Sequence, residues 1–202
     1  MKREKKIIGA IALDKKSPNG KVVQRVFKAT SGRYGRSELN LGYYDHENKT
    51  LVATDGSRMH YLTGKMVEEL FKDIGKSCHV VQDNTVLVCY DKESYGDFVN
   101  WKRVVPNGDD VEEIKGIKNM NIEDKTVSLL TKRNFQISAM LLGYVLGAQL
   151  NLMFVQDLIG ANYKVIRQKK DKTRPVLLVE EWDYYTFTAL LMPLQSITEV
   201  IV

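Results

Sequence analysis

Short runs in which hydrophobic and polar positions alternate follow one another along most of the chain, a pattern typical of half-buried β-strands. Gly, Asn and Asp residues separate the runs and mark the turns between them. In the first half of the chain we expect strands over residues 5–13, 39–44, 50–54, 59–63, 78–82 and 85–90. In the second half we expect strands over residues 126–131, 135–142, 163–168, 176–180 and 185–192.

Apolar residues at helical spacing interrupt these strands and predict helices over residues 20–30, 66–74, 109–117 and 150–160. Gly75 suits the end of the second helix, and Asp109 with Glu112 resembles a capping box for the third. The two halves repeat a similar order, which predicts an α+β fold of two domains, each built from repeated half-units of one helix plus antiparallel strands. Pro106 and the turn dipeptide that follows place the boundary between residues 1–106 and 107–202.

The first predicted helix has an apolar side and a basic side. Val22, Val23 and Val26 fall on the apolar side at 100° per residue, together with Phe27. Lys21, Arg25 and Lys28 form the basic stripe, and the glycine-containing loop after the helix adds Arg33 and Arg36. A solvated face is the ordinary explanation of such a stripe. The added arginines, on a backbone that can approach a phosphate closely, favour a DNA interface made of these five residues.

Composition narrows the function classes. The chain has 202 residues, 44% of them hydrophobic and 27% charged, which is a globular composition. A formal net charge of +5 permits a nucleic-acid partner without requiring one. Cys78 and Cys89 lack metal-ligand spacing, so we expect neither a disulfide framework nor a zinc site. We expect a cytoplasmic protein, because the basic start lacks a cleavage site and the uncharged stretch 134–156 carries polar residues in its interior.

The most informative stretch is residues 51–62, which predicts a strand, a polar turn and a second strand. Asp55-Gly56 favours a tight hairpin because glycine adopts positive φ at little cost. Residues 53–58, Ala-Thr-Asp-Gly-Ser-Arg, resemble the Ala-Thr-Asp-Gly-His-Arg signature of the bacterial DNA polymerase III β sliding clamp. Two later segments match the same family in the same order. Residues 100–106 resemble its Asn-Tyr-Arg-Arg-Val-Leu-Pro, and residues 190–194 resemble its closing Val-Val-Met-Pro-Met.

In that family the three segments line one apolar pocket between neighbouring domains, which receives a short peptide of polymerases and of the clamp loader. Carried over by position, the resemblance implies a peptide pocket of Thr54, Gly56, Arg58, Met59, Arg103, Val104, Leu190, Leu191, Met192 and Pro193. Apolar side chains there would supply desolvated area, and an arginine would pair with a peptide acid or carbonyl. Ser57 replaces the family's usual His, and Gln195 stands where the family often has Arg.

The resemblance implies a DNA clamp fold and a replication processivity factor that encircles duplex DNA, with no cofactor, no metal and no catalytic residue. Sliding clamps close rings of six similar domains, so a chain of about two domain-lengths implies a homotrimer joined head to tail through edge strands. We expect residues 85–90 and 176–180 to be those edges, because neither strand contains proline.

Two alternatives stay open. A ringless clamp-fold accessory protein would bind a protein peptide or DNA without closing a ring. A small hydrolase would use Asp55, Ser57 and Arg58, but no base stands at a recognisable spacing from them. His46, His60 and His79 form no metal-ligand motif, and no Walker-type phosphate loop is present in the sequence. These observations favour a binding protein over an enzyme.

Overall fold

The computed structural model describes residues 4–30, 37–106, 111–114, 154, 158, 163–169 and 174–193. The chain divides into two compact units. The first comprises Met1–Asn100 and Glu181–Thr188, and the second comprises Trp101–Glu180 and Ala189–Val202. The domain boundary expected between residues 106 and 107 stays a prediction, because residues 107–110 lie outside the described ranges.

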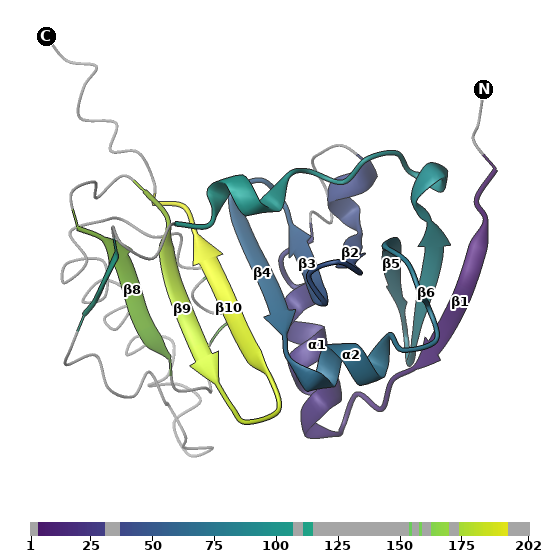
Figure 1. Cartoon of the computed structure of the whole chain (residues 1–202), viewed down its shortest axis with the longest axis horizontal. Helices are drawn as coiled ribbons and strands as arrows, with labels where there is room; N and C mark the ends of the chain where they lie inside the picture. The colour runs from purple at the N-terminus through teal and green to yellow at the C-terminus, as the bar shows by residue number, and fades with distance from the viewer. Residues whose placement is uncertain are drawn as a thin grey trace, which may run out of the picture. The chain divides into compact units, whose positions relative to one another are not determined.

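An antiparallel sheet forms the first unit (Figure 1). Its strands are β1 (Ile7–Ala12), β2 (Gly42–Asp45), β3 (Thr50–Thr54), β4 (Arg58–Thr63), β5 (Cys78–Asp83), β6 (Val86–Asp91) and the first residues of β10 (Thr186–Leu191). The order across the sheet is β1-β6-β5-β2-β3-β4-β10. Three of the six neighbouring pairs are consecutive along the chain, namely β5–β6, β2–β3 and β3–β4. The other three join distant segments, and in one of them β1 pairs with β6, with Ile11 opposite Leu87.

Two α-helices and three short 3-10 helices accompany the strands in the described part of the chain. The α-helices are α1 (Pro18–Phe27) and α2 (Lys65–Leu70), and the 3-10 helices are η1 (Ser37–Asn40), η2 (Lys92–Ser94) and η3 (Trp101–Val104). α1 begins where it does because the Ser17 hydroxyl accepts a hydrogen bond from the Gly20 amide at 3.0 Å. Pro18 follows in the first helical turn, where its missing N–H costs nothing.

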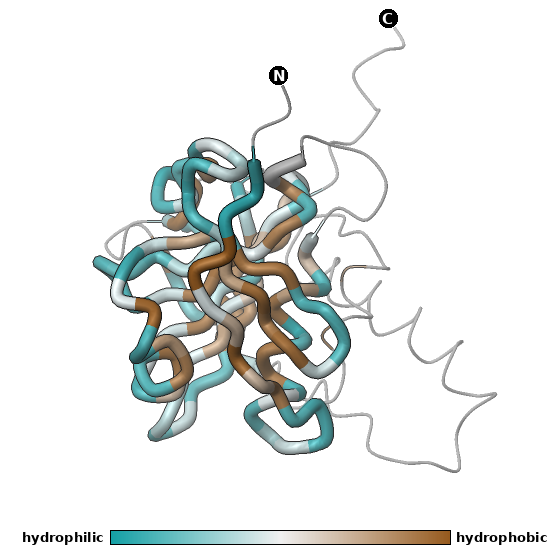
Figure 2. The backbone as a smooth tube through the Cα atoms, turned by 90° about the vertical axis from the view of Figure 1, so that its right-hand side faces the viewer, coloured by the Kyte–Doolittle hydropathy of each residue, from teal (hydrophilic) through white to brown (hydrophobic). Residues whose placement is uncertain are grey.

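The core of the first unit lies on the face of the sheet that α1 and α2 cover. Val26 and Leu62 are fully buried there, and the Tyr44 ring stacks on Phe71 with 4.2 Å between centroids. Neighbouring residues of a strand point to opposite faces, so Tyr43 lies on the other side, where it stacks on Phe98 at 4.9 Å. Figure 2 shows hydrophobic stretches running along the strands and hydrophilic stretches at the turns.

The second unit contains the last residues of β10 with three further strands, in the order β10-β9-β8-β7. These are β9 (Val176–Glu181), β8 (Lys164–Gln168) and β7 (Val111–Glu113). Arg167 of β8 donates from Nε to Oε1 of Glu112 at 2.8 Å. The two residues are directly opposite in the β7–β8 register, so this ion pair fixes the alignment of the two strands.

Most of the expected elements among the described residues are confirmed. Strands form at the positions predicted for residues 5–13, 50–54, 59–63, 78–82, 85–90, 163–168, 176–180 and 185–192, with small shifts at their ends. The helix expected over residues 20–30 is α1, and the one expected over 66–74 ends early, at Leu70. The strands expected at 126–131 and 135–142, and all of the 150–160 helix except residues 154 and 158, lie outside the described residues. The α+β composition holds for the described chain, whereas the repeated half-units stay a prediction.

Two local predictions are wrong. Residues 111–113 form strand β7 instead of the start of a helix, and Glu112 pairs across the ladder with Arg167. Residues 37–40 form a 3-10 helix, and β2 begins only at Gly42. A Cβ at Gly42 would lie 2.7 Å from Cε1 of Phe27, so the strand starts at a glycine that admits the α1 side chain.

The predicted edge strands are also wrong. β6 pairs with β1 on one side and with β5 on the other. β9 lies between β8 and β10 in the strand order. Among the described strands, the outermost in the order are β1 and β7 instead. Both owe their places to pairings between distant parts of the sequence, which alternation along a single strand does not reveal.

Candidate functional site

α1 presents the basic stripe expected from its sequence. Lys21 and Lys28 are exposed, whereas the apolar residues on the other side of the helix are buried. Arg25 is half-buried, and its guanidinium carbon lies 4.8 Å from the centroid of the Phe187 ring, within cation–π distance. Arg33 and Arg36 lie outside the described residues. In its described part, the stripe therefore offers two exposed ammonium groups beside one arginine that packs on the protein.

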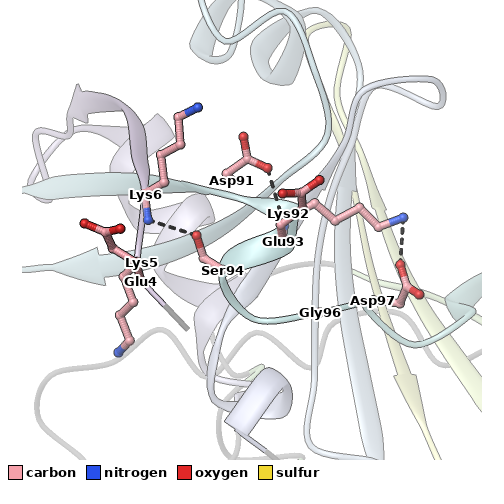
Figure 3. A pocket seen from close by; sticks show the side chains of 9 residues that line it. All are labelled: Glu4, Lys5, Lys6, Asp91, Lys92, Glu93, Ser94, Gly96 and Asp97. Carbon is pink, nitrogen blue, oxygen red and sulfur yellow. Dashed lines mark hydrogen bonds and ion pairs between the residues drawn. The ribbon is translucent and has the colours of Figure 1, made fainter. Parts of the chain in front are cut away.

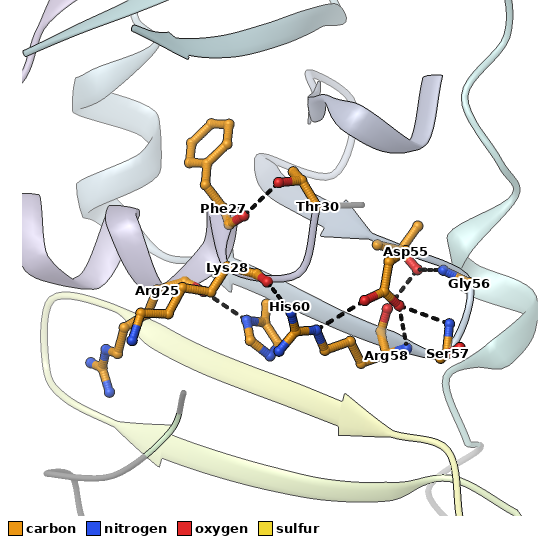
Figure 4. Close-up of polar contacts among 10 residues, drawn as sticks. Arg25, Phe27, Lys28, Thr30, Asp55, Gly56, Ser57, Arg58 and His60 are labelled. Carbon is orange, nitrogen blue, oxygen red and sulfur yellow. Dashed lines mark hydrogen bonds and ion pairs between the residues drawn. The ribbon is translucent and has the colours of Figure 1, made fainter. Parts of the chain in front are cut away.

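The β3–β4 turn is built by its own side chains (Figure 4). Oδ1 of Asp55 accepts hydrogen bonds from the Ser57 amide at 2.9 Å and the Arg58 amide at 3.0 Å. The Thr54 hydroxyl donates to the Arg58 carbonyl at 2.6 Å and accepts from the Gly56 amide at 3.1 Å. Gly56 has φ of +90°, which glycine adopts without strain. The Thr-Asp-Gly part of the motif is therefore explained by turn chemistry.

Two side chains of β4 fasten this hairpin to the last turn of α1. Arg58 forms an ion pair from Nε to Oδ2 of Asp55 at 3.1 Å and donates from its terminal nitrogen to the Lys28 carbonyl. His60 is buried and donates from Nδ1 to the Arg25 carbonyl at 2.6 Å. The last carbonyls of a helix lack intrahelical partners, so these bonds satisfy them and hold α1 in place. Figure 4 shows Arg58 and His60 reaching toward α1 from the same strand.

We expect Arg58→Leu to lower the free energy of unfolding by about 2 kcal/mol, because the Arg58 and Asp55 side chains are only 10% and 15% exposed and Asp55 would lose its partner. The substitution also releases the Lys28 carbonyl, so amide hydrogen exchange should rise at Ala29 and Thr30. Chemical denaturation measures the first effect and exchange the second. Arg103→Leu, at an exposed arginine, is the control and should change stability little. Equal losses in the two variants would contradict the fastening role.

Four of the ten predicted pocket residues belong to the first unit. Thr54 and Met59 are buried, Arg58 is half-buried, and Gly56 is exposed. Thr54, Gly56 and Arg58 take part in the turn bonds described above. Met59 is opposite Thr54 in the β3–β4 register and is 2% exposed.

The other six predicted pocket residues belong to the second unit. Leu190 and Leu191 are buried in β10, and Pro193 is half-buried. Val104 and Met192 are 47% and 38% exposed, which is unusual for large apolar side chains, and Arg103 is exposed as well. Exposed apolar side chains of this size are unusual on a protein surface and are compatible with contact to a partner. That all ten residues line one pocket stays a prediction.

The candidate hydrolytic group is already engaged in the turn. The Asp55 carboxylate accepts from the Ser57 and Arg58 amides and pairs with the Arg58 guanidinium. A carboxylate so occupied is directed into its own turn, so it is poorly placed to take a proton from a nucleophile. Within the described ranges, no group of three or more His, Cys, Asp or Glu residues is arranged to hold a metal ion.

The chain is similar in structure to bacterial β sliding clamps. The match to the Helicobacter pylori beta clamp in complex with diflunisal covers 67% of that chain and 95% of this one, with 12% identity and a TM-score of 0.49. The match to the DNA polymerase sliding clamp of Pseudomonas aeruginosa covers 65% of that chain and 93% of this one, with 15% identity and a TM-score of 0.48. The match to the Helicobacter pylori beta clamp bound to a DNA ligase peptide covers 66% of that chain and 95% of this one, with 12% identity and a TM-score of 0.46.

This chain spans about two thirds of the length of the clamps it matches. No protein-family model matches the chain, and neither does any curated protein. Among the described helices, none has the length and apolar character needed to cross a membrane.

A large cavity of about 1060 Å³ opens at the start of β1, beside η2 (Figure 3). Its lining mixes both charges: Glu4, Lys5, Lys6, Asp91, Lys92, Glu93 and Asp97, with Ser94 and Gly96. Hydrogen bonding with Asp97, 2.8 Å away, raises the pKa of Lys92, and the Lys76 ammonium lowers the pKa of Asp91. The lining therefore carries side chains of both charges, and Lys92 and Asp97 form an ion pair within it.

The two cysteines are free thiols buried on adjacent strands of the first unit. Cys78 of β5 hydrogen-bonds with Cys89 of β6, and this bond together with burial raises the pKa of Cys78. The pair therefore behaves as part of the apolar core.

Sequence reasoning missed the part that His60 plays in this site. From the sequence, His60 was weighed only as a metal ligand and found outside any motif, and Arg58 was considered for the peptide pocket and for a hydrolytic group. The available signal was their spacing, because residues two apart on a strand point to the same face. The basic stripe of α1 and the clamp-like hairpin were predicted as two separate features, and the structure joins them through these two side chains.

Proposed function

We propose that this protein is a sliding-clamp-like replication processivity factor of the cytoplasm, which encircles duplex DNA and docks short peptides of a polymerase or clamp loader. The proposal includes a division into domains at residues 1–106 and 107–202. The observation that carries it is the basic face of α1, with Lys21 and Lys28 exposed, whose helix is held in place by the clamp-like hairpin.

The proposed DNA contact is electrostatic. Lys21, Arg25, Lys28, Arg33 and Arg36 would approach phosphates, which carry the same charge at every position of the duplex. Contacts of this kind carry no sequence information, so the protein would bind weakly and slide. The +5 formal net charge of the chain favours such contacts without creating a strong field.

The proposed ring is a homotrimer in which β1 of one copy meets β7 of the next. These are the outermost of the described strands, and an outer strand has backbone groups available for a partner strand. Exposed Lys5 and Lys6 outnumber Glu4 just before β1, whereas β7 ends in exposed Glu113, so the two edges carry opposite net charge. The +5 charge of each copy opposes closure, and DNA or salt would screen this repulsion.

Sedimentation velocity across a concentration series, with and without duplex DNA, tests the assembly. We expect a trimer at high protein concentration and a larger share of trimer when DNA is present. Ile7→Lys places a charge at a 58% exposed position of β1 and should reduce association, whereas Glu47→Lys, at an exposed turn, should not. A monomer under every condition would refute the ring and favour the ringless accessory protein.

The proposed peptide pocket consists of Thr54, Gly56, Arg58, Met59, Arg103, Val104, Leu190, Leu191, Met192 and Pro193. Its support is the exposure of Val104 and Met192, together with the order of the three clamp-like segments in the sequence. The partner peptide would bury these apolar side chains, and an exposed arginine would meet its acidic or carbonyl groups.

We expect Met192→Asp to weaken binding of a clamp-binding peptide at least about tenfold, because a carboxylate would be desolvated in an apolar contact. Isothermal titration calorimetry measures the change. Ile7→Asp is the matched control, since it places the same group at another exposed apolar position, and it should leave peptide affinity unchanged. A wild-type protein that binds no such peptide would remove the pocket from the proposal.

A further inference from the structure

Trp182, in the turn between β9 and β10, is 64% exposed, more than any other large apolar side chain in the described ranges. Tyr185 is half-buried beside it, with 6.4 Å between the ring centroids. Tryptophan is costly to leave in water and is enriched among the residues that dominate binding energy at protein interfaces. We define the tip as residues 181–185, all of which belong to the first unit.

The tip is held in one conformation by the first unit. The Trp182 amide donates to the Tyr185 carbonyl at 2.9 Å, and the Met66 amide donates to the Tyr184 carbonyl at 3.1 Å. The Tyr184 hydroxyl donates to the Glu69 carboxylate, and this bond raises the pKa of Tyr184. Gly64 allows the close approach, because a Cβ there would lie 3.0 Å from the Tyr184 carbonyl oxygen. A rigid aromatic anchor loses little conformational entropy on binding.

The surroundings of Trp182 are acidic, in contrast to the +5 net charge of the chain. Glu181 and Asp183 flank it and are exposed. Glu68 and Glu69 are exposed on α2, the helix to which the tip is bonded, and exposed Lys65 and Lys72 lie three residues before Glu68 and three residues after Glu69. Carboxylates repel phosphates, so this surface is unsuited to nucleic acid. They attract guanidinium and ammonium groups, which also bind favourably over an indole ring.

We propose that the tip is a docking site for an arginine-bearing peptide segment of a partner protein. An arginine would lie over the Trp182 indole while Asp183 and Glu181 accept its hydrogen bonds, and an apolar neighbour in the peptide would cover the Tyr185 ring. This site is distinct from the α1 stripe and from the ten predicted pocket residues, and it requires neither DNA binding nor a ring.

Tryptophan fluorescence tests the site directly. The chain has two tryptophans, so Trp101→Phe leaves Trp182 as the only reporter. The probe is a short peptide of alternating arginine and leucine, and its counterpart alternates glutamate and leucine. We expect the arginine peptide to shift the Trp182 emission to shorter wavelength in a saturable manner, and the glutamate peptide to have no effect.

Asp183→Lys in the same background should weaken the arginine peptide about tenfold or more, because one attraction becomes a repulsion. Glu47→Lys makes the same charge change at an exposed turn outside the tip and should leave the affinity unchanged. Equal binding by both variants, or an equal response to the glutamate peptide, would overturn the proposal. So would a saturable response to a duplex oligonucleotide. The peptide experiment does not probe the α1 stripe. A negative result would therefore reject the tip as a docking site and would say nothing about the proposed clamp function.

Discussion

Replacing the whole basic set with glutamine should reduce the salt dependence of duplex binding by about 4 units of slope in log affinity against log salt, since each lost phosphate contact removes about 0.9. The set is Lys21, Arg25, Lys28, Arg33 and Arg36. The reason is counterion release, which requires charge at the phosphate and no particular base. Arg25 should contribute least, because its guanidinium packs on the Phe187 ring. Fluorescence anisotropy across a salt series measures the slope.

A matched variant separates this interface from general charge. It removes the same number of positive charges at exposed positions outside α1 and its loop, namely Lys72, Lys92, Lys102, Lys164 and Lys169. We expect the control to retain most of the wild-type slope, with both variants melting as cooperatively as the wild type. A wild-type slope in the α1 variant, or an equal loss in the control, would remove α1 as the DNA-binding face.

Gly20→Ala should destabilise the protein by about 3 kcal/mol, although alanine is ordinarily the better helix former by about 1 kcal/mol. A Cβ at residue 20 would overlap the carbonyl oxygen of Asp14 and stand 2.7 Å from its carbonyl carbon. That carbonyl cannot easily move, because it accepts from both the amide and the hydroxyl of Ser17, the residue that caps α1. The clash therefore outweighs the gain in helix propensity. Chemical denaturation with circular dichroism measures the change.

Asn19→Ala is the control for this prediction, since it makes a similar gain in helix propensity one residue earlier, at an exposed position. We expect it to leave stability unchanged or slightly higher. If Gly20→Ala were equally neutral, the start of α1 would not be fixed by the contact with Asp14. DNA affinity should fall in Gly20→Ala, because displacing the helix moves Lys21 away from its place on the exposed face.

Local chemistry explains what the sequence predicted well. Asp55 and Thr54 form the turn at residues 54–58 by hydrogen bonds to backbone groups within four residues. A short stretch of sequence is therefore enough to predict this turn. The two sides of α1 follow from helical periodicity alone, and Val22, Val23 and Val26 are buried as expected. Features of this kind depend on neighbours along the chain.

Distant pairing explains what the sequence did not predict. β7 is a three-residue strand whose Glu112 pairs with Arg167, 55 residues away, so its local capping-box pattern gave the wrong element. β6 was expected at an edge, but β1 joins it from the start of the chain. The hydrogen bond from His60 to the Arg25 carbonyl joins residues 35 positions apart, so no local sequence pattern predicts it. Each of these depends on tertiary packing, which overrides local preference.

Retention on circular and linear duplexes of equal length and sequence tests the central proposal most directly. A nicked circle and its linearised form are incubated with protein at a concentration where the trimer forms, and free protein is then removed by gel filtration at moderate salt. A ring that encircles DNA stays on the circle and leaves the linear duplex by sliding off its ends. We predict retention on the circle and its loss on linearisation. Equal retention on both forms, or retention on neither, would contradict encirclement.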